Sequence, residues 1–397
     1  MPHIRKRFLE GLLRKTLRYS PIVGIFGHRQ VGKTTLANLL SKRYISLDSA
    51  SSLALASQDA ASFLEKNKAS PLVIDECQLA PELFPALKEH VRQNQSPGQF
   101  LLTGSVRFSS RRAIRESLTG RIVAWELLPM DMSETYQSTL PIALIKMLTA
   151  KSVDIDLPTA NYFTEKNYLR YLQNGGLPGI FSIRDSAIKR QRYETQINTI
   201  LERDLQLIFP TTLSYRTLRH LLATLASKVG EPLEWSSLSR AVRISIPTLY
   251  KLIAAFEAMF LIRLIPTVGS QKKAVLFFED VGEANYLSSL AKNELTALTL
   301  FLFANLRTQF MYRPEASVEI FQYRNRGGGF VPLCFNTSNH YLGILPSLEE
   351  NPSDSILGSA RSFLRKYKQA KILIVHRGDK DKILQDNIRI VSAGQLI

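Results

Sequence analysis

The residues whose types and spacing most clearly predict chemistry form one loop, followed directly by Thr35: Gly27, His28, Arg29, Gln30, Val31, Gly32, Lys33 and Thr34. Glycine at both ends lets the backbone curve tightly, so that successive N–H groups can point at one phosphate. The lysine can contact the β- and γ-phosphates, and the hydroxyl of Thr34 can ligate Mg²⁺. The loop alone also fits an ordinary glycine turn with an exposed lysine.

A second chemical element, the run PLVIDE at residues 71–76, favours the phosphate-binding interpretation. An apolar strand that ends in two carboxylates would place Asp75 beside Mg²⁺ and Glu76 where it can polarise a water molecule. By itself this run would fit an exposed acidic turn. Together, in this order, the two elements predict that residues 27–35 bind ATP and that Thr34 and Asp75 hold Mg²⁺.

Hydrolysis of ATP needs further polar groups beyond Glu76. Thr103 or Ser105, after another apolar run, is the natural candidate to sense the γ-phosphate. An arginine usually offsets the charge that develops during the reaction. The candidates are Arg107, Arg121 and Arg203, and we predict Arg121 to be catalytic. Any of the three could instead be a solvated surface arginine.

The elements that must position these residues are short strands and helices in the first third of the chain. Continuous apolar runs predict strands at residues 21–26, 43–47, 72–74, 99–103 and 122–127, with a helix at 33–42. Runs without alternation are typical of strands buried on both faces, and therefore of a parallel sheet covered by helices.

The rest of the chain changes pattern twice. Residues 130–229 look mostly helical, with a turn at GGLP, and residues 238–265 resemble a winged helix-turn-helix in which Ser245 caps a helix that has Pro247 in its first turn. A mixed α/β pattern follows, with strands near 319–323, 331–335 and 372–375 and a loop at 346–358. We therefore expect an α/β chain with four parts: a P-loop ATPase domain at 1–135, a helical region at 136–230, a winged-helix-like domain at 231–281 and a mixed α/β domain at 282–397.

Composition excludes several classes of protein. With 397 residues, 45% of them hydrophobic, the chain is long enough for two to four globular domains. Its apolar stretches are shorter than the roughly 20 residues of a membrane span, and its N-terminus lacks the pattern of a secretory signal. Two isolated cysteines, Cys77 and Cys334, favour neither a disulfide framework nor a zinc site. We expect a cytoplasmic protein that does not associate with membranes.

The charge balance leaves the partner open. Fifty-one Lys and Arg against 34 Asp and Glu give a net charge of +17, which fits a polyanionic partner or simply a well-solvated surface. The basic residues form three groups: Arg5, Lys6, Arg7, Arg14, Lys15 and Arg18; Arg107, Arg111, Arg112, Arg115 and Arg121; and Arg361, Arg365, Lys366, Lys368 and Lys371, expected on a helix. Double-stranded DNA is one candidate partner, and Thr248, Tyr250 and Lys251 are its potential readers on the winged helix.

The chain resembles bacterial and archaeal AAA-type ATPases that carry a C-terminal domain of restriction-endonuclease-like fold. The matching stretches run in the family's order: GHRQVGKTTL, RYISLDSA, PLVIDECQLAPELFPALKEHV, GQFLLTGSVRF, ESLTGRIVAWELLPM, GGLPGIF, LERDLQ, ISIPTLYKLIAAFEAMFLI and FFEDVG. The resemblance implies ATP and Mg²⁺ binding, an AAA-like sheet and a winged helix. It implies no particular substrate.

The last third departs from that family, whose nuclease-like domains carry a Glu, then an Asp, then Glu-x-Lys. Glu294 fits the first position and Glu319 or Ile320 occupies the second, but Cys334-Phe335-Asn336 replaces the third. A thiol and an amide cannot replace a carboxylate and a lysine around Mg²⁺. We therefore expect a degenerate, non-cleaving nuclease fold.

Three functions remain open from the sequence. The first is an ATPase that couples turnover to remodelling of a partner, with DNA as one candidate. The second is a slow nucleotide-dependent switch or scaffold that uses the degenerate C-terminal domain for protein recognition. The third, an ATP-gated nuclease, is disfavoured by Cys334 and Asn336. A homo-oligomer, in which a neighbouring subunit supplies the arginine, is compatible with the first.

Overall fold

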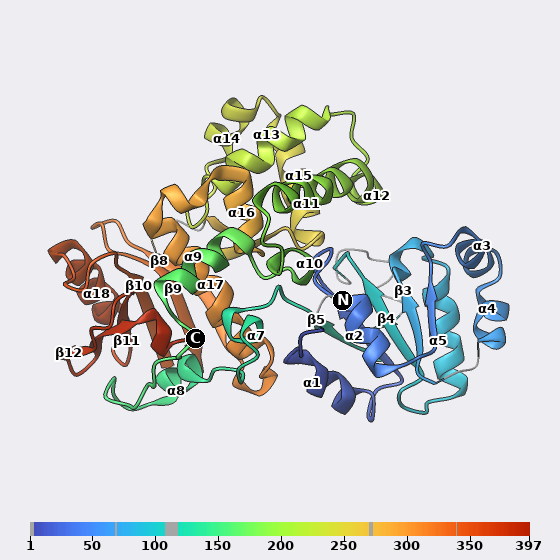
Figure 1. Ribbon diagram of the computed structural model, residues 1–397, viewed down its shortest axis with the longest axis horizontal. Coiled ribbons are helices and arrows are strands. Elements are labelled where there is room, and N and C mark those ends of the chain that lie inside the picture. Colours follow the sequence, from blue (N-terminus) through green and yellow to red (C-terminus); the bar gives the residue numbers. More distant parts are fainter. Residues whose placement is uncertain (1–3, 68–69, 108–117, 270–272, 339) are drawn as a thin grey trace. The chain divides into compact units, whose positions relative to one another are not determined.

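The computed structural model describes residues 4–67, 70–107, 118–269, 273–338 and 340–397 (Figure 1). The chain forms two compact units. The first comprises Met1–Pro129 together with two short stretches, Leu177–Gly179 and Ala258–Leu261, and the second comprises the remaining residues. The first unit ends close to the boundary expected at residue 135. The three segments expected after it share the second unit, and their division into domains stays a prediction.

The sheet of the first unit is parallel throughout, as the sequence predicted. Its order is β2-β3-β4-β1-β5, with bounds as follows: β1 Ile22–Phe26, β2 Tyr44–Ser46, β3 Leu72–Asp75, β4 Phe100–Gly104 and β5 Ile122–Glu126. The three central strands are fully buried, whereas the edge strands β2 and β5 are partly exposed. Because all strands run the same way, their carboxyl ends meet at one edge of the sheet.

Helices pack against this sheet to form the core of the first unit. They are α1 Leu9–Thr16, α2 Lys33–Leu40, α3 Ala50–Gln58, α4 Ala60–Lys66 and α5 Leu83–Gln93, with a 3₁₀ turn at Cys77–Leu79. Phe63, Phe84 and Leu87 pack with the apolar side chains of β1, β3 and β4. This packing leaves the carboxyl edge of the sheet to the loops that follow the strands.

The second unit begins with helices, as expected. They are α7 Met132–Thr135, α8 Ala143–Thr149, α9 Glu165–Asn174, α10 Pro178–Phe181, α11 Ser186–Thr199, a π-helix at Ile200–Asp204, α12 Leu205–Ile208 and α13 Tyr215–Ala226. Two helices, α14 Trp235–Val242 and α15 Ile246–Ala258, are then followed by the antiparallel pair β6 Ile262–Gly269 and β7 Ala274–Phe278. The order of elements is that of a helix-turn-helix with a hairpin, while its winged-helix character stays a prediction.

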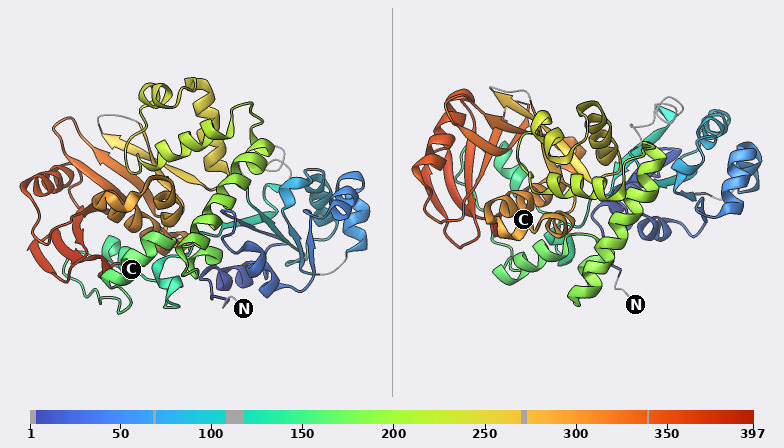
Figure 2. Two further views of the ribbon diagram at one scale, coloured as in Figure 1. Left: turned by 45° about the horizontal axis from the view of Figure 1, so that its top comes forward. Right: turned by 90° about the horizontal axis from the view of Figure 1, so that it is seen from above.

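A larger sheet fills the rest of the second unit (Figure 2). Its order is β12-β13-β11-β10-β9-β8-β6-β7, and the strands and helices not yet named are α16 Val281–Ser288, α17 Glu294–Met311, β8 Glu319–Arg324, β9 Phe330–Thr337, β10 His340–Pro346, α18 Asp354–Lys366, β11 Lys371–His376, β12 Lys382–Gln385 and β13 Ile388–Ser392. Helix α18 packs on β9, β10 and β11. The three strands expected from the sequence are present. The structure adds β10, β12 and β13, which the sequence analysis missed.

The structure corrects two expectations about the C-terminal basic helix. The loop expected at 346–358 ends earlier, because Ser353 accepts a hydrogen bond from the Ile356 N–H and caps α18. Lys368 lies beyond that helix, and Lys371 begins β11 with only 4% of its surface exposed. The Lys371 ammonium donates to the carbonyls of Leu148 and Ala150, so it is not available to a polyanion.

Gly175 and Gly176, the first residues of the GGLPG motif, pack closely against the FFEDVG motif in the second unit. Asp280 caps α16 and also accepts a hydrogen bond of 2.6 Å from the Gly176 N–H. A Cβ on Gly176 would lie 2.1 Å from the carbonyl oxygen of Met130, and one on Gly282 would lie 2.4 Å from the Gly175 nitrogen. These glycines are therefore required by close backbone approach. Within the described ranges, no helix is long and apolar enough to cross a bilayer.

Candidate functional site

The predicted phosphate loop connects the end of β1 to the start of α2. Gly32 adopts a φ of +99°, which favours glycine, and immediately precedes the helix. A Cβ on Gly27 would lie 2.3 Å from the carbonyl oxygen of Leu127, so this position also accepts only glycine. The N-terminal end of α2, with its positive dipole end, therefore opens onto the loop.

Lys33 lies inside this loop. Its ammonium donates to the carbonyl oxygens of Gly27 at 3.0 Å and His28 at 2.9 Å, and only 5% of the residue is exposed. His28 and Val31 are buried, whereas Arg29 and Gln30 are at least partly exposed and Thr34 and Thr35 are exposed. A cation enclosed by the loop backbone is suited to phosphate oxygens, which are the ligands the motif predicts.

Arg7 also contacts this site, although its sequence position had grouped it with basic residues that could contact a polyanion. The residue is buried, with only 5% of its surface exposed. Its guanidinium donates to the carbonyls of Val31 at 2.8 Å and Leu128 at 2.6 Å. Pro178 packs against the same loop: its Cγ would lie 3.6 Å from a Cβ placed on Gly32. Both contacts connect residues far apart in sequence, so no local pattern could reveal them.

Asp75 gathers three hydroxyl groups at the carboxyl edge of the sheet. Its Oδ2 accepts from Thr34 at 3.0 Å and from Tyr44 at 2.5 Å, and its Oδ1 accepts from Thr103. The reason is in part topological: β3 and β4 are parallel neighbours, so Thr103 near the end of β4 lies beside Asp75, while Tyr44 begins β2 opposite Val73 and reaches Asp75 with its long side chain. Hydroxyl and carboxylate oxygens are ligands that Mg²⁺ prefers, so Thr34 and Asp75 fit a magnesium site.

Tyr44 was not foreseen as part of the site. Burial, and then the hydrogen bond and negative charge of Asp75, raise the pKa of Tyr44 to about 12. The phenol is therefore protonated at neutral pH and acts as the donor to Asp75. The available signal was the RYISL strand itself, because a parallel neighbour of the strand that ends in Asp75 brings polar side chains to the same edge.

Glu76 lies next to Asp75 in a left-handed conformation, with a φ of +55°. Its Oε2 accepts a hydrogen bond from Ser105 at 3.2 Å and another from Gln78. The structure thus brings Thr103, within β4, to Asp75 and Ser105, just after β4, to Glu76, while their roles in catalysis stay predictions. Gln78, in the turn after β3, is a further residue that the sequence analysis missed.

The predicted arginines of the first unit, Arg107 and Arg121, have other partners. Arg121 precedes β5, and because β5 is parallel to β1, it lies at the edge of the sheet opposite the loop, where its guanidinium donates to the Thr119 carbonyl. Arg107 forms an ion pair of 2.8 Å with Glu126. Arg203 belongs to the second unit. Arg111, Arg112 and Arg115 fall outside the described residues.

The expected nuclease positions of the second unit are also separated. Glu319 and Asn336 are cross-strand partners at one end of β8 and β9. Glu294 begins α17, where its carboxylate forms an ion pair of 2.7 Å with Arg377. Cys334 is fully buried, and burial raises the pKa of its thiol well above the usual value. Among the described residues, no group of three or more His, Cys, Asp or Glu side chains could hold a metal ion.

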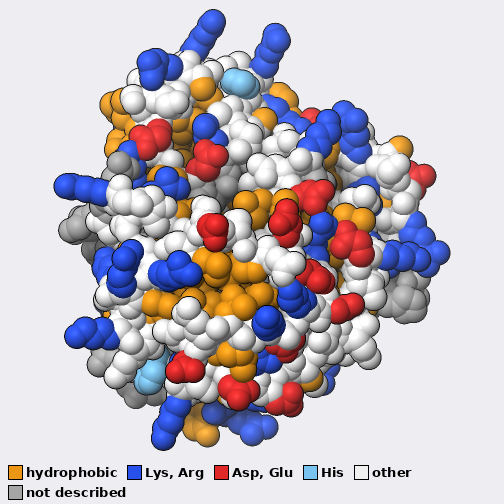
Figure 3. All heavy atoms as spheres, turned by 90° about the vertical axis from the view of Figure 1, so that its left-hand side faces the viewer, with side chains coloured by type: hydrophobic (Ala, Val, Ile, Leu, Met, Phe, Trp, Pro, Cys, Tyr) orange, Lys and Arg blue, Asp and Glu red, His pale blue; other side chains and the backbone are white. Residues whose placement is uncertain are grey.

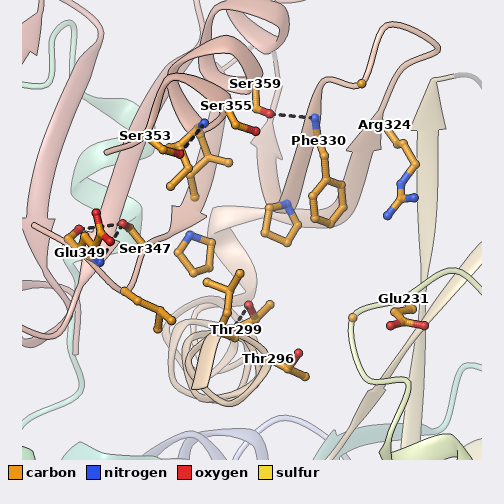
Figure 4. Close-up of a pocket in the computed structure, with 18 of the residues that line it drawn as sticks. Glu231, Thr296, Thr299, Arg324, Phe330, Ser347, Glu349, Ser353, Ser355 and Ser359 are labelled. Carbon is orange, nitrogen blue, oxygen red and sulfur yellow. Dashed lines mark hydrogen bonds between the residues drawn. The ribbon is translucent and has the colours of Figure 1, made fainter. Parts of the chain in front are cut away.

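A pocket of about 590 Å³ lies beside the first turns of α17 (Figure 4). Thr296 and Thr299 of its first turns line this pocket together with Arg324, at the end of β8 opposite Glu319, and Phe330, which begins β9. Figure 3 shows an apolar patch on one face of the molecule, with Lys and Arg side chains spread around it among Asp and Glu. On this face the basic surplus is therefore scattered rather than gathered into one patch.

Comparisons with known proteins agree with the geometry of the first unit. Residues 19–136 match the family model described as an AAA domain, and residues 165–294 match a domain of unknown function (DUF8612). The first match spans the loop, both carboxylates and all five strands of the parallel sheet. This part of the chain is therefore similar to AAA domains. The restriction-endonuclease-like character of residues 282–397 stays a prediction.

Similar full-length chains come from mycobacteria and an archaeon. Uncharacterized proteins of Mycobacterium bovis and Mycobacterium tuberculosis are each 26% identical to this chain over 411 residues, which span 99% of this chain and 85% of theirs. A solved Walker-type ATPase of Pyrococcus abyssi is 18% identical, with 72% of this chain and 96% of that one covered and a TM-score of 0.38. That structural similarity is too low to support a functional inference.

Proposed function

We propose that this chain binds ATP with Mg²⁺ at the loop of residues 27–35 and hydrolyses it, and that turnover drives rearrangement of a partner. One observation carries the proposal: at the carboxyl edge of the sheet, Thr34 and Thr103 contact Asp75 while Ser105 contacts Glu76. Residues that are far apart in the sequence thus form one polar cluster beside the phosphate loop.

Each residue of the cluster has a role in this proposal. Lys33 and the loop N–H groups hold the phosphates, while Thr34 and Asp75 hold Mg²⁺. Bound Mg²⁺ supplies positive charge that offsets the charge of the phosphates. Glu76 orients the attacking water and takes its proton. Ser105 and Gln78 fix the Glu76 carboxylate.

The arginine of the reaction comes from elsewhere in this proposal. Arg121 lies at the opposite edge of its own sheet and Arg107 is paired with Glu126. A homo-oligomer, in which an arginine of a neighbouring subunit reaches the γ-phosphate, satisfies the requirement. An assembly that forms only with ATP would support this arrangement.

Double-stranded DNA is the proposed partner, through the face of α14 and α15. Tyr250 and Lys251 are exposed on α15, and Arg240 and Arg243 are exposed beside it. Cations around a helix that projects from a helix-turn-helix suit phosphate and groove contacts. Turnover that rises with duplex DNA, in a manner weakened by added salt, would support this choice.

The second candidate is a slow nucleotide-dependent switch that recognises a protein partner. The observation in its favour is that Glu76 already accepts hydrogen bonds from both Gln78 and Ser105. Both donors contact the same oxygen, Oε2, and so occupy lone pairs that would otherwise accept the proton of a water molecule. Tight ATP binding with slow turnover that is indifferent to DNA would favour this alternative.

The experiment that tests the proposal is Mg²⁺-dependent ATP hydrolysis by the purified chain, with and without duplex DNA. Lys33→Ala and Glu76→Gln are measured in parallel, together with the affinity of each protein for a fluorescent ATP analogue. We expect turnover in the wild type only. ATP binding by the wild type without any turnover would contradict hydrolysis and leave nucleotide binding intact.

A further inference from the structure

A short stretch at the end of α15 is built into the first unit. Residues Ala258–Leu261 belong to that unit, although the chain on either side belongs to the second. Phe260 is 2% exposed and packs in the core of the parallel sheet with Phe26 and Leu102. It adopts a φ of +57°, which is uncommon for a bulky residue and indicates that the surrounding packing holds it there.

Arg107, which follows the candidate nucleotide site in the sequence, contacts this stretch with both its backbone and its side chain. Its backbone N–H donates to the Ala258 carbonyl at 2.7 Å, and its guanidinium carbon lies 4.3 Å from the centre of the Phe260 ring. The same guanidinium pairs with Glu126 at 2.8 Å, and the two side chains are only 17% and 13% exposed. A cation over an aromatic ring is attracted most strongly where water is largely excluded.

These contacts converge on the strand ends that carry the candidate site. Arg107 follows Ser105 by two residues, and Ser105 contacts Glu76. Just before them, the Gly104 carbonyl accepts the N–H of Gly27, the first residue of the phosphate loop, at 3.3 Å. On the other side, Glu126 is the last residue of β5 and the register partner of Phe26. Arg107 therefore ties the ends of β4, β5 and α15 together beside the loop.

We propose that Arg107 is a positioning residue through which the end of α15 sets Ser105, and with it the Glu76 carboxylate. The inference rests on the proposed hydrolysis and adds its regulation. Displacement of residues 258–261 withdraws Ser105 from Glu76 and slows hydrolysis. It leaves Lys33 and the loop backbone in place, so nucleotide affinity is unchanged. Because α15 also carries the exposed Tyr250 and Lys251, a partner that binds there acts on hydrolysis rather than on ATP binding.

The test separates turnover from binding in three variants and one control. Arg107→Met removes the charge over the ring, Phe260→Leu removes the ring, and Arg107→Lys keeps a cation. The control is Phe63→Leu, because Phe63 is equally buried in the same core but lies on α4. For each protein, kcat of ATP hydrolysis and the affinity for mant-ATP are measured, after circular dichroism has shown that it is folded.

We expect Arg107→Met and Phe260→Leu each to lower kcat about tenfold, because the free energy of a desolvated cation–ring contact corresponds to roughly that factor in rate. Their affinity for mant-ATP should stay within about twofold of wild type, because Lys33 and the loop are untouched. Arg107→Lys should recover most of the activity, and Phe63→Leu should keep the wild-type kcat.

Two results would overturn the inference alone: a kcat of the Arg107 and Phe260 variants no lower than that of Phe63→Leu, or a loss of mant-ATP affinity as large as the loss of kcat. A wild type that binds mant-ATP but never hydrolyses ATP would instead contradict the proposed hydrolysis, and the inference with it. The wild-type measurement therefore distinguishes the two failures.

Discussion

In the first unit, Asp75 and Glu76 lie within hydrogen-bonding distance of hydroxyl and amide groups from three other parts of the chain. In the second unit, Glu319 begins β8, whereas the first turn of α17, which Glu294 begins, lines a pocket with Arg324 at the other end of β8. That strand has six residues, which corresponds to about 20 Å. Both units thus carry carboxylates at positions that suggested metal chemistry, and only one unit gathers them.

The difference lies in how the elements are connected. In the first unit, Asp75, Glu76, Thr103 and Ser105 lie at or just after the ends of two neighbouring strands of one parallel sheet, and parallel strands bring their carboxyl ends to one edge whatever the length of the connections. In the second unit, Glu294 is placed by α17, an 18-residue helix that is about 27 Å long. Its first turn faces Arg324, whereas the carboxylate it was expected to join is at the far end of the strand.

The largest expected effect tests the assembled site. Glu76→Gln keeps the shape of the side chain and removes its basicity, so turnover should fall by about 10²- to 10⁴-fold. Glu294→Gln, the same change in the second unit, is the matched control and should leave ATP turnover unchanged. Steady-state hydrolysis at saturating ATP measures both. Equal losses of ATP turnover in the two variants would contradict the proposal that only the first unit carries the catalytic carboxylate.

Lys33→Ala should weaken ATP binding by tenfold or more, because a charge-assisted contact contributes roughly 1.5–3 kcal/mol. The control is Lys42→Ala, because Lys42 lies past the other end of α2 and donates to the Asn38 carbonyl. Titration with a fluorescent ATP analogue measures both affinities. Unchanged binding by Lys33→Ala would remove the loop from the proposed site.

Tyr44→Phe sharpens the comparison, because Tyr44 reaches Asp75 only through sheet topology. Asp75 would lose one of its three hydrogen-bond donors, a loss of about 1 kcal/mol. Turnover at limiting Mg²⁺ should therefore fall by about fivefold. Tyr19→Phe serves as the control, since Tyr19 is 79% exposed. A Tyr44→Phe protein with the wild-type magnesium dependence would show that the phenol does not influence the carboxylate.

The smallest effect is expected at Glu294. Its ion pair with Arg377 is partly exposed, so Glu294→Gln should change the free energy of unfolding by less than about 1 kcal/mol. Supercoiled plasmid incubated with the wild type and Mg²⁺ or Mn²⁺ should stay intact. Metal-dependent nicking that disappears in Glu294→Gln would show that the second unit cleaves DNA after all.

Much of the first unit could be predicted from the sequence. The strand bounds agree with the apolar runs to within about two residues, whereas the functional roles of Lys33, Asp75, Thr103 and Ser105 stay predictions. The strand predictions succeeded because they rest on local properties. A continuous apolar run can only be buried, and Gly27 and Gly32 permit a backbone that other residues do not.

The second unit was harder because its strands give weaker local signals. β10 contains Gly343 and ends at Pro346, two residues that usually interrupt strands, and it becomes one by pairing with β9 and β11. Lys371 reads as a member of a basic helix, but it begins β11 and donates to carbonyls more than 200 residues away in sequence. Tertiary pairing overrode the local pattern in both places.

The sequence by itself predicted the chemistry proposed for this protein: a loop suited to phosphates, a strand that ends in two carboxylates, and a last third that lacks some of the ligands expected from a family resemblance. The tertiary structure alone decided which residues support that chemistry. Arg7 and Tyr44 contact the loop and Asp75, and Phe260 contacts Arg107, across 24 to 153 residues of chain. Composition and periodicity report only on neighbours in sequence, whereas these contacts depend on strand order and on where the chain re-enters the first unit.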